Sequence, residues 1–506
     1  MSKVIWVLND QCDIESDLLK SCSQEDHVII VESRQELDLP YTHIKKTALI
    51  LNVMRHFSHA CLQFTPHVHH VTLDACAQHT QLEMMAKVSR QLGIFDVSMM
   101  TPKSYHHRET LKGMSEFKFT FFRDNNLISD EWVMWPWFKS KSFRMETFYQ
   151  RLRISTGLLM DHNGQPLGGA FNFDKHNQNP LKTIPPRHTR ISFTLDELTL
   201  KTLEEVQQKF SHQLGNLNDF NFAYDTHQAR KACDHFIQHL LPYFGHTQDN
   251  MIQEDAFVAH SLLSSYLNIG LLNPYEVCRK VHDLVVTQPD IIASAEGFVR
   301  QILGWREYMF YKYHTLMPKL LHDANHPTMN PLPALYWGGH TDMNCLHQTI
   351  RDSLSHAYSH HIQRLMISSN FANLAYINPY EVHQWFLGIY ADAYEWVEIP
   401  NTLGMGLYQD QGQIGSKPYV SSAAYINKMS NYCEGCFYNP KELTGERACP
   451  FNALYWNYIQ DHKDQLKHNP RMNMMVSTYE KFSDVKKENI RNQVESIFER
   501  LKKGQL

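Results

Sequence analysis

Residues 4–10 read VIWVLND, an apolar run of five residues that stops at two polar ones. HVIIVES at 27–33 repeats this pattern, and KKTALILNVMRHF (45–57) and HHVTLDA (69–75) contain further short apolar runs. By contrast, TQLEMMAKVSRQLG (80–93) carries apolar residues at helical spacing. Short buried strands that alternate with helices predict a parallel α/β sheet over the first 131 residues.

Polar residues end the first two predicted strands. Asn9 and Asp10 follow one strand, and Glu32 and Ser33 follow the next. Ligands of open parallel sheets bind beyond the carboxyl ends of the strands. We therefore expect these side chains to lie at a ligand site.

The composition is that of a globular protein without a membrane segment. Hydrophobic residues make up 43% and charged residues 20% of the 506, and no apolar run approaches the ~20 residues that cross a bilayer. The N-terminal run is too short for a signal peptide, so we expect a cytoplasmic protein whose 10 cysteines are reduced. The net charge of −5 argues against a uniformly basic nucleic-acid binder, but it allows a local basic face.

The character of the sequence changes after residue 131. WVMWPWFKSKSFRMETFYQRLRIS (132–155) is aromatic and basic, and the stretch 164–190 is rich in Gly, Pro and Asn, as in a long connector. A solvated charged face explains such a basic run, and contact with a phosphate backbone is the alternative because aromatic residues are interleaved. The bases concerned are Lys139, Lys141, Arg144, Arg151 and Arg153, continued by Lys182, Arg187 and Arg190.

Helical spacing dominates from residue 195 to the end. Thr194 and Glu197 have the spacing of a capping box at the start of a helix. The sequence therefore predicts an α/β domain (1–131), an interdomain linker (132–194) and a large helical domain (195–506). Further helices are expected over 226–241, 255–269, 274–286, 295–313, 341–374, 379–393 and 418–430.

Three cysteines near the C-terminal end have the spacing of metal ligands. Cys433 and Cys436 form a C-x-x-C pair, and Cys449 follows with a proline behind it. The best candidate for a fourth ligand is Cys345, because it lies near the start of the helix predicted over 341–374, where the helix dipole favours a thiolate.

The residue types leave the nature of this site open. Iron–sulfur clusters are held by four thiolates and tolerate irregular spacing, which favours a [4Fe–4S] cluster. Zinc would also accept three thiolates and an imidazole, with His347 or His462 as the fourth ligand. The third possibility is that the four cysteines are free thiols that bind no metal.

The predicted 341–374 helix also carries His360, His361 and Arg364. Acids among aromatic residues are usually paired, and Arg364 is a natural partner for Asp392. An ordinary helix pair with one buried ion pair accounts for this pattern equally well. Upstream, the serines of HSLLSSYLNIG (260–270) suit either a phosphate or a simple helix cap.

Four collinear motifs resemble the flavin domain of photolyases and cryptochromes. They are HSLLSSYLNIGLLNP (260–274), EGFVRQILGWREYMF (296–310), SHHIQRLM (359–366) and ADAYEWVEIPNTLGM (391–405). With the four cysteines the chain is similar to the iron–sulfur bacterial branch, several members of which repair (6-4) lesions in DNA. The resemblance runs over essentially the whole chain.

The resemblance implies an FAD site, a [4Fe–4S] cluster and a 6,7-dimethyl-8-ribityllumazine antenna between the two domains. The residues that match FAD contacts are Ser261, Leu262, Ser264, Arg364, Asp392 and Glu398. Those that match antenna contacts are Asp10, Glu32 and Ser33. The cluster ligands are Cys345, Cys433, Cys436 and Cys449.

His361 matches the histidine that acts as acid and base at the lesion, and Trp337 and Trp385 match tryptophans that pass electrons to excited flavin. Positions that match lesion-side contacts are Trp305, Arg306, His360, Met405, Tyr419 and Tyr425.

Two departures bear on these roles. Phe386 stands where some relatives have a redox-active tyrosine, so the electron route could use Tyr390, Tyr394 or Trp396. Asn9 stands where relatives often have glycine in the antenna loop.

The resemblance implies a monomeric enzyme that binds UV-damaged DNA and repairs (6-4) photoproducts with light. A neutral flavin in water is a poor donor, so the protein must hold it reduced beside a flipped lesion while an acid–base residue supplies a proton. A cryptochrome that signals to a partner protein is the alternative. A zinc-stabilised DNA-binding protein is a third reading, which predicts a colourless preparation.

Overall fold

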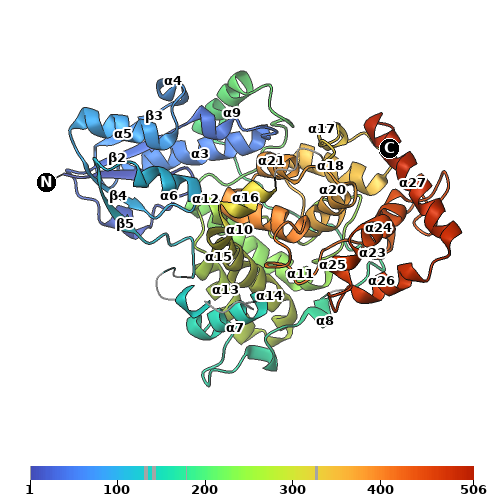
Figure 1. Cartoon of the computed structure of the whole chain (residues 1–506). Coiled ribbons are helices and arrows are strands. Elements are labelled where there is room, and N and C mark those ends of the chain that lie inside the picture. The colour runs from blue at the N-terminus through green and yellow to red at the C-terminus, as the bar shows by residue number, and fades with distance from the viewer. Residues whose placement is uncertain (1, 130, 132–134, 139–143, 178, 325–328) are drawn as a thin grey trace.

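The computed structural model describes residues 2–129, 131, 135–138, 144–177, 179–324 and 329–506 (Figure 1). Its N-terminal part is a five-stranded sheet in the order β3-β2-β1-β4-β5, with every neighbouring pair parallel. This confirms the predicted parallel α/β sheet. The strands are β1 (Val4–Val7), β2 (His27–Val31), β3 (Val68–Val71), β4 (Asp96–Met100) and β5 (Lys118–Phe122).

The stretch 45–57 is not a strand but the middle of a long helix, α3 (Ile44–Cys61). It is buried along most of its length because it lies between the sheet and the helical part of the molecule. Lys45 and Lys46 donate hydrogen bonds to the carbonyl oxygens of Ser355, Leu387 and Ala393 in the helical part. A helix buried on several faces shows a nearly continuous apolar run, which resembles a buried strand in sequence.

The two faces of the sheet belong to different cores. Val4, Trp6 and Ile29 pack with α5 (Gln81–Leu92) in a small core of their own. Ile5, Val7 and Val28 point the other way and join a core that continues into the helical part. The sheet is therefore joined to the helices through shared apolar packing, with helices on both of its faces (Figure 1).

Helices fill the chain from residue 197 onward, as predicted. The first of them, α9 (Glu197–Lys209), starts later than the predicted capping box. Asp196 is its N-cap and accepts a hydrogen bond from the backbone of Thr199, so the prediction of Thr194 as the cap was wrong. Aspartate competes well with threonine for this position. Next come α10 (Thr226–His235), α11 (Leu241–Thr247), α12 (Ser264–Ile269), α13 (Pro274–Thr287), α14 (Ile292–Val299) and α15 (Glu307–Leu316).

The predicted 341–374 helix is broken in two. Helix α18 (Asn344–His356) ends at Ala357, which has a left-handed backbone with φ of 53°. The chain resumes in the short α19 (His361–Gln363), the π-helical η6 (Arg364–Ser369) and α20 (Asn370–Leu374). Cys345 and His361 therefore lie on separate helices. The structure continues through α21 (Pro379–Ile389), α22 (Glu395–Ile399), α23 (Ala423–Met429), α24 (Pro450–Asp461), α26 (Asn473–Glu480) and α27 (Asp484–Lys502).

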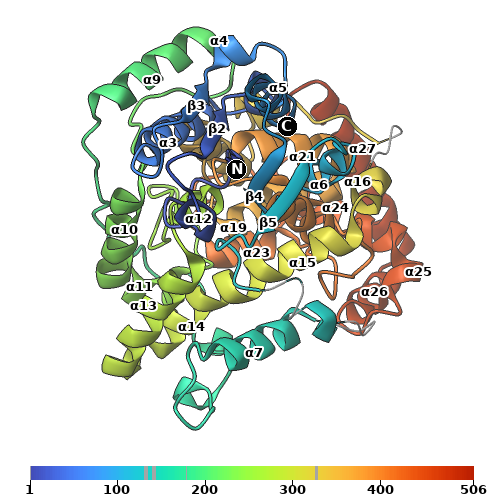
Figure 2. The same cartoon turned by 90° about the vertical axis from the view of Figure 1, so that its left-hand side faces the viewer.

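The connector region holds α7 (Met145–Thr156), which packs against η5 (Arg300–Arg306) and lies beside α14 and α15 (Figure 2). Its basic residues do not form one exposed face. Arg153 is fully buried and donates to the carbonyl oxygens of Leu158 and Leu159. Arg190 donates to the carbonyl of Val258, while Lys139 and Lys141 lie outside the described residues.

Among the described helices, none combines the length and the apolar character that a bilayer crossing requires.

Candidate functional site

An ion pair between Arg364 and Asp392 lies at the centre of the helical part. Arg364 begins η6, and Asp392 lies in the turn between α21 and α22. The guanidinium Nη1 and Nη2 atoms lie 2.9 and 3.2 Å from the two carboxylate oxygens, which confirms the predicted pairing. Ser264 Oγ donates to Asp392 Oδ2 at 2.7 Å. Burial alone would raise the pKa of Asp392, but the charge and hydrogen bonds of Arg364, aided by Ser264, lower it.

His361 lies close to this pair in sequence. Its side chain is exposed, although protein surrounds it closely enough for burial to lower its pKa to about 4, helped by the charge of Arg364. Arg364 and Asp392 are also only partly covered, so all three side chains remain accessible to a ligand. At pH 7 this histidine is neutral.

His360 points elsewhere. Its side chain is only 3% exposed, and its ring stacks on His260 with centroids 4.4 Å apart and planes 14° from parallel. The two neighbouring side chains differ in exposure: His361 is accessible and His360 is buried, and contact of His360 with a lesion stays a prediction.

The predicted phosphate-binding segment leads into α12. Ser261, Leu262 and Ser264 are each partly accessible, and Leu262 has a left-handed backbone with φ of 57°. Ser264 is the one of the three that contacts the ion pair, through Asp392. The segment thus contacts the ion pair through Ser264, and its backbone at Leu262 has a conformation that leucine rarely adopts.

Glu398 forms a second buried pair, with a partner that the sequence did not reveal. Its Oε2 atom lies 2.5 Å from Nδ1 of His383 on α21. Burial would lower the pKa of His383, but the charge and hydrogen bond of Glu398 raise it. The other carboxylate oxygen, Oε1, is buried without a hydrogen-bond partner in the part of the chain that the structure describes. Such an oxygen is suited to accept a hydrogen bond from a bound ligand.

Aromatic rings connect the ion pair with the surface. Tyr390 lies under the Arg364 guanidinium, 3.8 Å from it, and its ring centroid is 5.7 Å from that of the fully buried Trp385. The Trp385 ring is 5.2 Å from Tyr336, and its indole N–H donates to the Tyr336 carbonyl at 2.8 Å. The next residue, Trp337, is 39% exposed.

Two further predicted lesion contacts are buried. Arg306 is 8% exposed and donates to the Asn126 carbonyl at 2.6 Å and to Asn268 Oδ1 at 3.1 Å. It fastens the end of the sheet region to the helical part, and its contact with DNA stays a prediction. Met405 is likewise buried in the core. Trp305, Tyr419 and Tyr425 keep partial exposure.

The three residues predicted at the antenna have partners within the protein. Glu32 pairs with Arg55, whose Nε and Nη2 atoms lie 2.8 and 3.0 Å from its oxygens. Ser33 Oγ donates to the His79 carbonyl at 2.8 Å, and Asp10 Oδ2 lies 3.5 Å from Lys103. All three are buried. Their side chains thus have partners at the strand ends, and their contact with an antenna stays a prediction.

A fourth polar residue near the strand ends, Glu36, was not predicted from the sequence. Its side chain is more exposed than those of Asp10, Glu32 and Ser33. It accepts a hydrogen bond from the Gln81 backbone at 3.0 Å, and its carboxylate lies 3.9 Å from His107. Burial raises its pKa even though the side chain is partly accessible. No local motif marks this residue, because its surroundings come from three separate segments.

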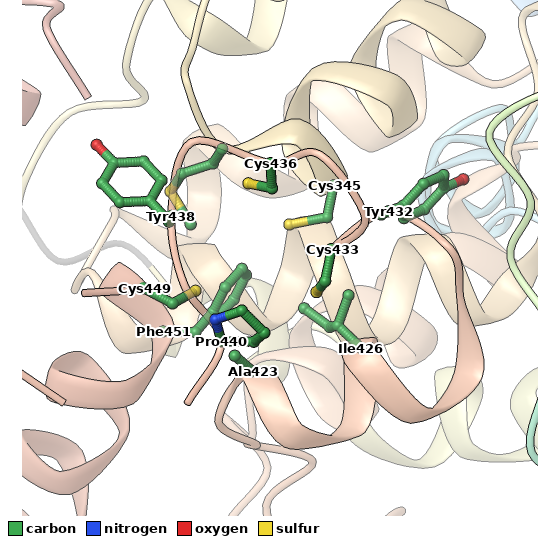
Figure 3. A pocket seen from close by; sticks show the side chains of 11 residues that line it. Cys345, Ala423, Ile426, Tyr432, Cys433, Cys436, Tyr438, Pro440, Cys449 and Phe451 are labelled. Atoms are coloured by element: carbon green, nitrogen blue, oxygen red, sulfur yellow. The ribbon is translucent and has the colours of Figure 1, made fainter. Parts of the chain in front are cut away.

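The four predicted cysteines line one cavity. Cys345 comes from α18, Cys433 and Cys436 from the loop after α23, and Cys449 from the N-cap of α24. Their sulfur atoms face a common space bordered by apolar groups such as Ile426 and Phe451 (Figure 3). The prediction that Cys345 joins the other three is confirmed.

Four thiols are a donor set that suits an iron–sulfur cluster and would also suit a single zinc ion. Within the described ranges, no three His, Cys, Asp or Glu side chains are placed to hold a single metal ion. Burial, followed by the neighbouring thiols, raises the pKa of Cys449 to about 12 and that of Cys433 to about 11. A cationic group between them would stabilise the thiolates.

Comparison with known proteins gives one consistent result. A family model described as "deoxyribodipyrimidine photo-lyase-related protein" matches residues 5–222. A curated (6-4) photolyase of Agrobacterium fabrum is 36% identical over 511 residues, which cover 99% of this chain and 100% of that protein. A class III photolyase from Agrobacterium tumefaciens (TM-score 0.55, 14% identity, 93% of this chain and 86% of that one) and a Synechocystis cryptochrome (0.58, 12%, 95% and 99%) share the fold.

Proposed function

Because the chain belongs to the photolyase and cryptochrome family, alongside the (6-4) photolyase of Agrobacterium fabrum, we propose that it repairs (6-4) photoproducts in DNA with light. The observation that supports this substrate is His361, an accessible, neutral histidine three residues from Arg364. An acid–base group at this place is what the chemistry of this lesion requires.

The site has groups suited to FAD, which when reduced supplies a photoexcited electron. Arg364 and Asp392 would lie beside its ring as a preformed pair, each fixed by the other's charge. Ser264 keeps the carboxylate oriented. The unpartnered oxygen of Glu398 would accept a hydrogen bond from the ring, while His383 holds the opposite oxygen in place.

His361 would handle the proton. It is neutral in the free protein because burial and Arg364 lower its pKa to about 4. The phosphates of bound DNA would raise that pKa, since nearby negative charge favours the imidazolium. His361 would then gain its proton only when substrate is bound, and it would deliver that proton to the lesion. The damaged bases reach it by leaving the stack, which costs less for a disrupted pair than for an intact one.

Two further groups complete the proposal. The four thiolates of Cys345, Cys433, Cys436 and Cys449 would hold a [4Fe–4S] cluster. A ribityllumazine antenna would lie between an α/β unit (1–131) and a helical unit (195–506), with Glu36 rather than Glu32 as its acidic contact. Trp385 and Trp337 would carry electrons to the flavin from the surface.

The substitution His361→Ala tests the function. The variant should retain FAD at the wild-type ratio, measured by absorbance at about 450 nm, and should lose (6-4) repair by at least 100-fold, because general acid–base catalysis contributes about 10²–10⁴. Repair is followed on an oligonucleotide with one (6-4) lesion under blue light. His106→Ala, an exposed histidine of the sheet region, is the matched control.

Unimpaired repair by His361→Ala would contradict the role of this histidine. If the wild-type protein photoreduces its flavin but restores no lesion, the chain is a photoreceptor of the cryptochrome type instead.

A further inference from the structure

A buried hydrogen-bond chain connects the cysteine cavity with the start of α19. Its first member, Tyr432, directly precedes Cys433 and lines the cavity, and its side chain is completely buried. Its phenol oxygen points away from the sulfur atoms (Figure 3) and accepts a hydrogen bond of 2.9 Å from Nε2 of Gln363. Gln363 is itself 1% exposed.

Gln363 lies between His361 and Arg364 in sequence, and both ends of its amide are used. The nitrogen that donates to Tyr432 also lies 3.4 Å from Asp352 Oδ2, on the same helix as Cys345. The oxygen accepts the backbone N–H of His360 at 3.0 Å and thereby caps the first turn of α19. One side chain thus contacts two of the three chain segments that supply the cavity, and also the turn that carries His361.

From these contacts we propose that Gln363 and Tyr432 are positioning residues through which the contents of the cysteine cavity fix the orientation of His361 and Arg364. A group bound by Cys433 sets the backbone at Tyr432, and the phenol holds the Gln363 amide. The amide in turn closes the helix start. Without the bound group, the loop after α23 would loosen, and the hydrogen bond that caps α19 would open more often.

The geometry favours this coupling over an accidental contact. Both partners are buried, so an amide that lost Tyr432 could not turn to water and would remain partly unpaired. The break at Ala357 makes α19 the first turn of a new helical run that continues through η6 and α20, and the first turn of a helix has backbone N–H groups that only a cap can satisfy. Arg364 follows directly, and its Nε donates to the Ser359 carbonyl at 2.6 Å, across the same turn.

The cavity offers a matched pair of variants. Tyr432→Phe removes the hydroxyl that meets Gln363 and keeps the ring against the cavity. Tyr438→Phe removes the hydroxyl of a second tyrosine on the opposite side (Figure 3), whose oxygen accepts from Arg500 Nη2 at 2.6 Å and faces away from α19. Both proteins should keep wild-type iron and FAD contents.

Amide hydrogen exchange of the peptide 357–366 measures the coupling without reference to repair. Loss of one buried hydrogen bond should raise exchange there about fivefold in Tyr432→Phe and leave it unchanged in Tyr438→Phe. Removal of iron by a chelator should produce a similar rise in wild type and in Tyr438→Phe, but little further change in Tyr432→Phe, because the connection is already cut.

A second readout rests on the proposed function. In Tyr432→Phe the quantum yield of (6-4) repair should fall about fivefold, while affinity for lesion DNA stays as in wild type, because His361 acts in the chemical step. A general loss of structure would weaken both. If the wild-type protein shows no repair, the proposed function is wrong. The hydrogen-exchange result would still test the coupling between the cavity and α19, because it does not depend on repair.

Two results would overturn the proposal. One is wild-type exchange of 357–366 in Tyr432→Phe with the cluster intact. The other is an equal response to iron removal in Tyr432→Phe and Tyr438→Phe, which would mean that the cavity acts on α19 by another route or not at all.

Discussion

At the scale of single residues, His383 and Glu398 form the pair that most directly links charge to stability. The buried carboxylate partner of His383 raises the pKa of that histidine. His383 therefore holds its proton more tightly in the folded protein than in the unfolded chain. The stabilisation is fully present below the unfolded pKa of about 6.5 and is lost as the pH rises through the raised folded value.

We predict that the wild-type melting temperature falls over this upper range and that Glu398→Gln removes the decline. A charge-assisted buried hydrogen bond contributes about 2 kcal/mol, which sets the size of the effect. Thermal unfolding between pH 6 and 9 measures it. Glu116→Gln, which breaks the exposed pair with Arg90, should keep the wild-type slope, and parallel curves for wild type and Glu398→Gln would refute the prediction.

The residues that sequence reasoning found are those whose partners could be named from chemistry. Arg364 and Asp392 had to be paired because each is costly to bury alone, and four thiols had an obvious common purpose. His383 could not be found this way, since it is one of 31 histidines with no local mark. His360 and Arg306 match family positions, but their burial depends on distant packing and could not be predicted from the sequence.

At the scale of elements, the left-handed residue Ala357 divides what would otherwise be one long helix. A residue with a side chain loses about 1–2 kcal/mol of stability in this conformation, and glycine avoids that loss. Part of the gain is offset because glycine has more conformational freedom in the unfolded chain. Ala357→Gly should therefore stabilise the protein by about 1 kcal/mol.

Chemical denaturation followed by circular dichroism provides the measurement. Ala372→Gly, in the interior of α20, should destabilise the protein by about 1 kcal/mol. Alanine is unstrained in a helical conformation, so glycine brings only its entropic cost there. Equal effects of the two changes would show that the break at Ala357 is not strained.

Periodicity predicted many elements, but it missed β4 and β5, and the helix expected over 255–269 is only α12 (Ser264–Ile269). Two other failures have a clear physical reason. Helix α3 was taken for a strand because burial between two layers removes the polar stripe that reveals a helix. The break at Ala357 was missed because neither glycine nor proline marks it. Its cause lies in the packing of Ala391, whose backbone N–H donates to the Ala357 carbonyl at 3.0 Å.

At the scale of the whole molecule, the cysteine cavity joins α18, the loop after α23 and α24. Helix α27 packs on α24, and the Leu506 carbonyl accepts the backbone N–H of Asp342 at 3.1 Å, shortly before Cys345. The C-terminal helices thus depend on this junction from two sides.

We predict that Cys345→Ser yields protein without iron whose residues after 430 are cleaved at least tenfold faster by protease, because ligand binding energy at such a site is folding energy. Iron analysis and limited proteolysis provide the test. Cys278→Ser, at a buried cysteine of α13 outside the cavity, should keep its iron. A normal iron content in Cys345→Ser would show that Cys345 is not a ligand.

The cavity also bears on how the protein is made. Whatever the thiols bind closes a loop of chain from 345 to 449, and His361, Arg364, Asp392 and Glu398 all lie inside that loop. The sheet and early helices can fold as they leave the ribosome, but the loop can close only after Cys449 is made, 104 residues after Cys345. At about 5–20 residues per second, synthesis takes roughly 5–21 s to pass from the first ligand to the last, so the proposed photochemical centre is assembled after the sheet.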